Sequence, residues 1–369
     1  MIHYNVLAGF RCLGADCPDT CCRGWEMPTD ARQRARYAEK APELLATIDP
    51  ENGVMKRCGT GQQCAQLREG ICSIHENYGE EFLGDACYFY PRFIHHVGDS
   101  YVMSGAPSCP EMLRLMLTEK APFTQHEAVP ARMPNHRHNL VPEGFLQAQV
   151  EEIHAQCMGI AGDAARMPEV AVDALLGEVL ALAGQPIDKD VAAQSGDAHA
   201  LYYALALTEA FGAPGISARL ADVMAVMAQQ LDCRFDRATH KLALGEQASR
   251  AYPMLLARWN LDARAALAPV LRRWLQAQIA LTYFPFGGFS DASMIERAAV
   301  LVQRFATVRL ALMCHVSPAG IPPDEQTVIR VIQAIARFMD HLADIKLTRM
   351  IHRDSRWERA ERLRGLVRG

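Results

Sequence analysis

Residues 17–25 read CPDTCCRGW, so three cysteines fall within six positions and two of them, Cys21 and Cys22, are adjacent. A lone cysteine in a globular protein is usually a small buried hydrophobe. Three cysteines this close together, beside Trp25, indicate a disulfide framework, a redox relay or a metal centre. The choice decides whether this part of the chain folds around side chains alone or around a bound centre.

The rest of the sequence favours a reducing compartment. The first residues, MIHYNVLAGFRC, have no basic segment followed by an apolar one, so no signal peptide is expected. No run of ~18 apolar residues occurs, so no membrane span or membrane partner is expected either. We therefore expect a cytoplasmic protein, in which disulfides are disfavoured. A net charge of −4 gives no reason to expect nucleic acid as a partner.

The cysteines are distributed unevenly along the 369 residues. The first third of the chain holds nine of the twelve, and these are Cys12, Cys17, Cys21, Cys22, Cys58, Cys64, Cys72, Cys87 and Cys109. The other three, Cys157, Cys233 and Cys314, are scattered as isolated core cysteines would be, and we expect them to be buried.

Gly and Pro content and helical periodicity divide the chain into three parts. Residues 1–120 are interrupted by Gly and Pro and show no long helical period, so we expect a cysteine-rich module of loops and short helical turns around a bound centre, with a strand at 100–105. Residues 121–142 contain three prolines before Val141 and read as a linker. Residues 143–369 read as an α-helical domain, which makes the fold mainly α. Helices are expected near 143–160, 169–183, 198–211, 216–231 and 261–281.

Two further helices have defined starts. Ser293 and Glu296 have the spacing of a capping box. Pro322 and Pro323 precede a helix that begins with two acidic residues. Its apolar side chains recur at steps of three and four, at Val328, Ile332, Ile335, Phe338 and Leu342. The arginine-rich C-terminus reads as a solvated helix end.

Spacing alone leaves the kind of centre open. Zinc sites usually show paired C-x2-C knuckles, and none occurs here. Iron–sulfur clusters also use cysteine thiolates, commonly four for each [4Fe–4S] unit. Adjacent cysteines seldom both ligate one iron, so one of Cys21 and Cys22 either supports the other or serves another centre. His75, His95 and His96 are further candidate ligands, with a surface position as the alternative.

Three segments of the sequence together form a pattern that resembles a known protein family. FRCLGADCPDTCCRGWEMPTD, at 10–30, places an aromatic residue, four cysteines, Trp25 and Asp30 in a fixed pattern. The next segment, 64–92, contributes Cys64, Leu67, Cys72, Ile74, Gly79, Glu80, Leu83, Cys87, Tyr90, Pro91 and Arg92. The third, SCPEMLRLML, contributes Cys109, Pro110 and Glu111. Together they resemble the flagellin lysine-N-methylase family. Weaker echoes follow at 283–286, Arg337 and His341. The cysteine core is also similar to YkgJ-type zinc- or iron-chelating domains.

The methylase resemblance implies methyl transfer from S-adenosylmethionine to surface lysines of flagellin, with an iron–sulfur cluster in the cysteine-rich part. The expected cofactors are a [4Fe–4S] cluster, with zinc as the alternative metal, and S-adenosylmethionine. Eight cysteines are candidate ligands, twice the number that one cubane needs: Cys12, Cys17, Cys21, Cys22, Cys64, Cys72, Cys87 and Cys109. They imply either two centres or some cysteines that do not ligate.

Lysine methylation also needs a group that takes a proton from the amine. Tyr90 and Glu111 lie among the cysteines and are the candidate catalytic residues. Arg92 and Trp25 are the candidate residues for binding S-adenosylmethionine, Arg92 through a bidentate pair with its carboxylate. No strand, Gly-rich turn and helix of a dinucleotide-binding unit is found, so the cofactor is expected at the cluster or between the two regions.

Two other functions remain compatible with the sequence. One is a non-catalytic zinc- or iron-binding protein, and the other is an electron-transfer protein that uses the cluster alone. Iron–sulfur protein is coloured and zinc protein is not, and binding of S-adenosylmethionine separates a methylase from both.

Overall fold

The structure is a computed structural model, and it describes residues 1–59, 62–134, 138–185, 217–236, 241–288, 292–340 and 364–367. The expected helix at 198–211 and His341 lie outside these ranges. Of the arginine-rich C-terminus, only 364–367 is described. Those residues are buried, and Arg309 donates hydrogen bonds to the carbonyls of Leu366 and Val367, so the prediction of a solvated end is wrong there.

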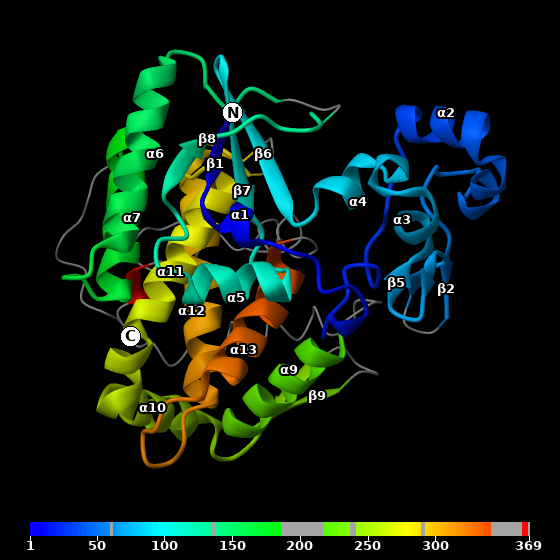
Figure 1. The fold of residues 1–369 in the computed structure, drawn as a ribbon. Coiled ribbons are helices and arrows are strands. Elements are labelled where there is room, and N and C mark those ends of the chain that lie inside the picture. The colour runs from blue at the N-terminus through cyan, green and yellow to red at the C-terminus, as the bar shows by residue number, and fades with distance from the viewer. Residues whose placement is uncertain are drawn as a thin grey trace.

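The larger part of the molecule is a helical body (Figure 1). Its long helices are α5 (Pro110–Thr118), α6 (Gln147–Gly162), α7 (Pro168–Leu182), α9 (Ala218–Gln230), α10 (Ala248–Arg258), α11 (Arg264–Thr282), α12 (Met294–Cys314) and α13 (Glu325–Phe338). A π-helical turn, Trp259–Ala263, joins α10 to α11, and a hairpin, β9 (Cys233–Asp236) and β10 (Lys241–Leu244), follows α9. The helices expected near 143–160, 169–183, 216–231 and 261–281 are confirmed.

The helix starts also agree with the sequence. The Ser293 hydroxyl caps α12 by accepting from the Glu296 N–H, and the Glu296 carboxylate accepts from the Ser293 N–H, which completes the capping box. Asp324 caps α13 by accepting a hydrogen bond from the Thr327 N–H at 2.7 Å. Helices α11 and α12 lie at the centre of the body, where Trp274 and Phe305 pack together. The body is therefore held by an extensive apolar core.

A four-stranded sheet at one end of the body was not expected beyond the strand at 100–105. Its strands lie in the order β6 (Arg92–Val97), β7 (Ser100–Gly105), β1 (Ile2–Tyr4) and β8 (Gln125–Glu127). Strands β6 and β7 form a hairpin, β1 lies parallel to β7, and β8 lies antiparallel to β1. β8 belongs to the segment that reads as a linker. A strand of three residues is too short to show an alternating pattern.

The cysteine-rich module lies at the right of Figure 1 and consists of short elements. They are α2 (Ala31–Lys40), two hairpins, α3 (Ser73–Tyr78) and α4 (Asp85–Phe89). The hairpins are β2 (Arg57–Cys58) with β3 (Gln63–Cys64), and β4 (Leu67–Arg68) with β5 (Ile71–Cys72). The ten-residue α2 was missed because only Gln33 and Tyr37 are buried on it, so its sequence has no apolar stripe.

The chain passes between the two regions more than once. From β1 it runs through α1 (Val6–Gly9) into the module, and it returns through α4 into β6 (Figure 1). No described helix is both long enough and apolar enough to span a bilayer.

Candidate functional site

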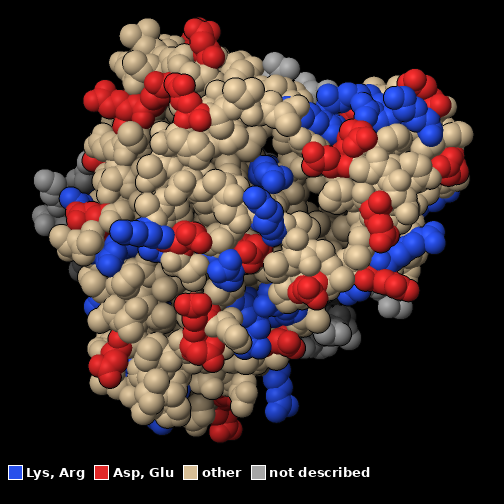
Figure 2. Space-filling view, in the orientation of Figure 1, with Lys and Arg blue, Asp and Glu red and all other residues tan. Residues whose placement is uncertain are grey.

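A cavity of about 520 Å³ lies where the module meets the body. All eight candidate cysteines line it, as do the four other residues singled out from the sequence. These twelve residues are Cys12, Cys17, Cys21, Cys22, Cys64, Cys72, Cys87, Cys109, Trp25, Tyr90, Arg92 and Glu111. Figure 2 shows the surface hollowed between the two regions, with Lys and Arg side chains along the hollow. Residues spread over about 100 positions of sequence therefore converge on one space.

The remaining cysteines lie elsewhere. Cys157, Cys233 and Cys314 are buried in the body, as predicted. Cys58 is exposed, and it is not among the residues that line the cavity. Of the candidate histidines, the lining includes His75 but neither His95 nor His96.

Backbone pairing positions the cysteines of the two hairpins. The Cys64 N–H donates to the carbonyl of Cys22 at 2.8 Å, which joins the first hairpin to the CPDTCC loop. Cys72 lies opposite Leu67 in the second hairpin and immediately precedes α3. Cys87 lies in α4, and its N–H donates to the carbonyl of Gly84. Short, regular backbone contacts thus fix thiols whose sequence spacing is irregular.

Two further cysteines come from the segment that enters the module, and Cys109 precedes α5 of the body. Cys12 and Cys17 flank a single 3₁₀ turn at 14–16, and the Gly14 N–H lies 3.5 Å from the Cys12 Sγ. The turn between β4 and β5 packs closely on this segment. A Cβ at Gly70, whose φ is +82°, would lie 2.9 Å from the Ala15 Cα. Glycine is therefore required there by both space and conformation.

The thiols that line the cavity affect one another's pKa. Burial raises the pKa of Cys64 to about 11 and that of Cys109 to about 12, and it raises the pKa of Cys87 further. The pKa of Cys22 is lowered, because Cys22 accepts a hydrogen bond from the Cys21 thiol, whose own pKa rises. Several thiolates in this space repel one another, so a bound cation is what would hold them ionised together.

The arrangement discriminates between kinds of centre. Within the described residues, no three His, Cys, Asp or Glu side chains are placed to hold one metal ion. A zinc ion with Zn–S bonds of about 2.3 Å needs its sulfurs about 3.8 Å apart. In a cluster the metal and sulfide atoms lie between the thiolates, which spreads them farther apart. The described thiols therefore form no ready-made site for a single metal ion, and they line one shared cavity.

Tyr90 forms part of the cavity wall. Its ring packs edge-on against Trp25, with 4.9 Å between centroids, and its hydroxyl lies 3.3 Å from the Ser108 Oγ. Burial, followed by the nearby Cys109 and Cys21, raises the pKa of Tyr90 well above its usual value. Tyr90 therefore remains a neutral phenol near neutral pH and cannot serve as a general base there.

Arg92 and Glu111 differ in their partners. The Arg92 guanidinium lies over the Phe10 ring at 5.2 Å, and among the described residues it has no carboxylate partner. Glu111, in the first turn of α5, accepts two hydrogen bonds from Arg114 at 2.7 and 2.8 Å, and its side chain is 13% exposed. Arg92 is thus available to an anionic ligand, whereas Glu111 is held in place by Arg114.

Helix α13 of the body holds the CPDTCCRGW loop. Arg337 donates hydrogen bonds to the carbonyls of Asp19 and Arg23 at 2.9 and 2.6 Å, and it pairs with the Asp19 carboxylate at 2.9 Å. Its guanidinium also lies 5.0 Å from the centroid of the Trp25 ring. Arg337, one of the weaker echoes of the resemblance, thus binds the loop that carries Cys17, Cys21 and Cys22.

Gln333 and Asp19 were missed by the sequence analysis. One turn before Arg337, the Gln333 Nε2 donates to the Asp19 Oδ2 and to the Ser108 carbonyl, each at 2.9 Å. A buried glutamine on an otherwise apolar helix face is the signal that could have identified this contact.

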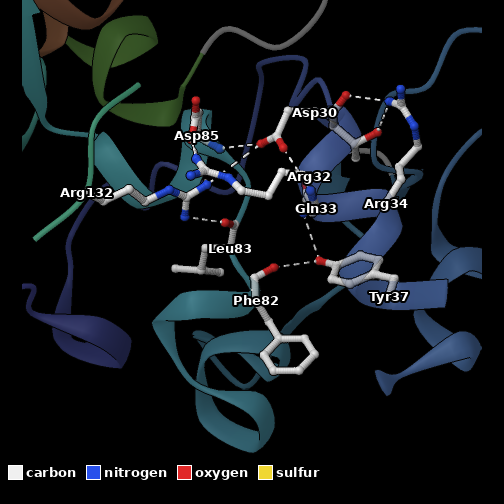
Figure 3. A network of polar contacts seen from close by, with 10 residues as sticks. Asp30, Arg32, Gln33, Arg34, Tyr37, Phe82, Leu83, Asp85 and Arg132 are labelled. Atoms are coloured by element: carbon white, nitrogen blue, oxygen red, sulfur yellow. Dashed lines mark hydrogen bonds and ion pairs between the residues drawn. The ribbon is translucent and has the colours of Figure 1, made fainter. Parts of the chain in front are cut away.

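Asp30, part of the resemblance pattern, has a structural role. It caps α2 through the Gln33 N–H at 2.8 Å, and it accepts from the Asp85 N–H at 3.0 Å (Figure 3). Asp85 begins α4, the helix that carries Cys87. Arg132, from the segment that reads as a linker, reaches back to the Asp85 carboxylate at 2.6 Å and to the Leu83 carbonyl at 2.8 Å. This network fixes one wall of the cavity.

Comparisons with known proteins give a distant likeness. No family model matches the chain, and no solved structure matches it. The flagellar biosynthetic protein FliU of Salmonella muenchen is 26% identical over 137 residues, which cover 32% of this chain and 81% of that protein.

Lysine-N-methylases of Salmonella typhimurium and Salmonella choleraesuis are each 24% identical over 183 residues, which cover 46% of this chain and 44% of each relative. The chain thus spans less than half the length of these two relatives. It is similar, at low identity, to proteins named for lysine methylation and for the building of flagella.

Proposed function

We propose that this protein is a lysine N-methyltransferase that uses S-adenosylmethionine and acts on surface lysines of flagellin. One observation carries the proposal: the twelve residues singled out from the sequence line one cavity, in a chain similar to lysine-N-methylases.

The reaction needs a neutral amine. A lysine side chain has a pKa of about 10.4 in water, so on the order of 0.1% or less is neutral near pH 7. The amine nitrogen attacks the methyl carbon of the sulfonium, the carbon–sulfur bond breaks, and S-adenosylhomocysteine leaves as a neutral thioether. The proton that the amine loses goes to the Glu111 carboxylate, which lines the cavity and is held by Arg114.

Arg92 and Trp25 bind the methyl donor in this proposal. The fork of Arg92 pairs with the carboxylate of S-adenosylmethionine, since its side chain has no carboxylate partner among the described residues. Trp25 offers aromatic surface to the donor and is itself held by Tyr90 and Arg337. Tyr90 contributes a neutral wall that excludes water from the reacting atoms.

The cysteines hold the expected [4Fe–4S] cofactor. When bound, this group supplies a fixed centre that organises the thiol-lined wall, and zinc is the alternative metal. What supports this is the donor set itself: eight thiols line one cavity, a ligand type that iron–sulfur clusters use.

The test is methyl transfer by protein purified without oxygen, incubated with S-adenosylmethionine and flagellin. Mass spectrometry should find lysines heavier by whole methyl groups. Glu111→Gln should lower kcat by roughly 10²-fold or more, because it removes the proton acceptor. Arg92→Gln should raise the KM for S-adenosylmethionine.

The matched control is Arg166→Gln, which breaks an exposed pair on the body and should change neither constant. Unmodified flagellin together with no binding of S-adenosylmethionine would overturn the proposed activity.

A further inference from the structure

Four carboxylates among the described residues line the cavity, and arginines hold three of them. An arginine this close cancels most of the attraction that a carboxylate exerts on a cation approaching from solvent. The three are Asp19, Asp85 and Glu111, which lie 2.9, 2.6 and 2.7 Å from the side chains of Arg337, Arg132 and Arg114, respectively.

The fourth carboxylate, Glu26, differs from the other three. Its Oε1 lies 3.7 Å from the Arg57 Nη2, which is beyond hydrogen-bond distance, and its side chain is 77% exposed. Because Glu26 both lines the cavity and reaches solvent, it lies at the cavity edge. Among the carboxylates of the described lining, Glu26 is therefore the one best placed to receive a cation from solvent.

The backbone around Glu26 is fixed, although the side chain is exposed. The Gly24 N–H donates to the Gln62 carbonyl at 3.2 Å, and the Met27 carbonyl accepts from the Met55 N–H at 2.9 Å. Glu26 also follows directly after Trp25, whose ring packs on Tyr90 in the cavity wall. A fixed segment thus presents this carboxylate directly after the residue that contacts the methyl donor in the proposed function.

Two apolar side chains also lie at the cavity edge. Leu13 and Ile71 line the cavity, and they are 38% and 39% exposed. Strand β5, which carries Ile71, contacts the 3₁₀ turn that follows Leu13, and Gly70 packs there on the Ala15 Cα. Leu13 and Ile71 therefore belong to neighbouring segments of the edge.

These features match the chemistry of a lysine on the surface of another protein. A lysine side chain carries a compact, mobile cation on a stem of four methylenes, and the stem packs on apolar surface while the ammonium group stays in water. An exposed carboxylate attracts the ammonium group, and an apolar edge contacts the stem and any apolar side chains beside it.

We propose that the acceptor lysine enters the cavity past Glu26, whose carboxylate receives the ammonium group, and that Leu13 and Ile71 contact apolar side chains next to that lysine. The acceptor is a lysine-bearing segment with apolar neighbours, exposed on the surface of its protein. The inference rests on the proposed function for the identity of the acceptor. Glu26 binds the incoming side chain and takes no part in the proton transfer.

The kinetics of methyl transfer to flagellin test the entry site. Glu26→Gln should raise the KM for flagellin about two- to fivefold, as expected for an exposed ion pair, and leave kcat and the KM for S-adenosylmethionine unchanged. Added salt should reduce this difference from the wild type, because salt screens an exposed pair. Ile71→Thr and Leu13→Gln should raise the same KM at low and high salt alike.

Two matched controls lie outside the cavity lining. Glu39→Gln removes an exposed carboxylate from α2, and Val170→Thr changes an exposed apolar side chain on α7. Neither variant should change any of the three constants.

A cross-link that needs no methyl transfer separates this inference from the proposed activity. A carbodiimide activates a carboxylate, and a lysine amine then forms an amide with it as the urea leaves. With flagellin present and S-adenosylmethionine absent, mass spectrometry should find Glu26 joined to a lysine of flagellin. Glu39 should form no such cross-link, and Glu26→Gln should lose it.

An unchanged KM for flagellin in Glu26→Gln, with methyl transfer intact, would overturn the entry site and leave the proposed function standing. An unchanged KM in Ile71→Thr and Leu13→Gln would overturn the apolar contact. A cross-link at Glu26 without methyl transfer would uphold the entry site and overturn the proposed activity, and the absence of both would overturn both.

Discussion

The cysteine-rich module and the helical body achieve order by different means. The body buries large side chains, among them Trp259, Trp274 and Phe305, in one extensive core. The buried apolar core of the module is small, and it consists of Tyr37, Ala41, Leu44, Ile48, Met55, Ile74 and Phe82. Small cores rarely stabilise a fold alone, and metals or disulfides usually supplement them. We therefore expect the module, unlike the body, to depend on the bound centre that the proposed function gives it.

The largest expected effect is that of removing the metal. Oxidation followed by a strong iron chelator should abolish amide protection in the module, because structural metal sites contribute on the order of 10 kcal/mol to folding. Protection in α11 and α12 should persist. Hydrogen exchange read by mass spectrometry measures both regions in one sample. A module that keeps its protection without metal would show that its small core is sufficient.

The complementary experiment destabilises the body and leaves the module intact. Phe305→Ala should lower the free energy of unfolding of the body by about 3–5 kcal/mol, because Phe305 is fully buried against Trp274. Denaturant unfolding followed by circular dichroism gives this value. Iron content should be unchanged, since Phe305 is not among the residues that line the cavity. Loss of iron in Phe305→Ala would mean that the two regions fold as one unit.

Arg337 joins the two regions, and its removal should separate them. Arg337→Met leaves the carbonyls of Asp19 and Arg23 without their donor and breaks a buried ion pair, which typically costs about 3 kcal/mol. Calorimetry should show the module unfolding earlier than in the wild type. Arg337→Lys keeps the charge but not the fork, so an intermediate effect is expected. If the unfolding transition of the module is unchanged in both variants, Arg337 does not stabilise the module against the body.

The body could be predicted from the sequence more fully than the module. The reason is the one that makes their cores differ: long elements bury apolar faces, and short ones bury few. Helices of the body bury apolar faces, so α12 could be predicted from its capping box and α13 from its prolines, acidic start and apolar spacing. In the module, α2 has almost no apolar face, and strands of two or three residues have too few positions for a pattern. The cysteines predicted the site because their chemistry is informative without regular structure. The sequence could mark Gln333 as a polar residue on an apolar helix face, but the partners of Gln333 and Asp30 were not predictable, because they depend on which segments meet in space.

Buried histidines make the body sensitive to acid. Burial lowers the pKa values of His95 and His154 to about 4, from about 6.5 when unfolded. Between these values the unfolded chain binds more protons, so stability should fall as the pH drops below about 6.5, by roughly 1.4 kcal/mol per pH unit for each histidine. His154→Gln should reduce this slope by about half in urea unfolding between pH 7 and 5. The exposed His126→Gln should leave it unchanged, and an equal slope in both would exclude the buried pair as its origin.

The smallest effects compare the same capping chemistry in the two regions. Ser293 caps α12 and has only this local role, so Ser293→Ala should cost about 1 kcal/mol. Asp30 caps α2 but also accepts from the Asp85 N–H and lies 3.8 Å from Arg132, and the two backbone hydrogen bonds outweigh burial and lower its pKa.

Asp30→Ala should therefore cost more than Ser293→Ala and also loosen α4, whereas Asp30→Asn keeps the cap and loses only the charge. The measurements are urea unfolding for both sites and, for Asp30, the rate at which iron is lost to a chelator. Faster iron loss in Asp30→Ala than in Asp30→Asn would show that the cap itself holds Cys87 in place. Equal iron loss in both variants would assign that role to the ion pair with Arg132, and iron loss as slow as in the wild type would mean that the module keeps its iron without this network.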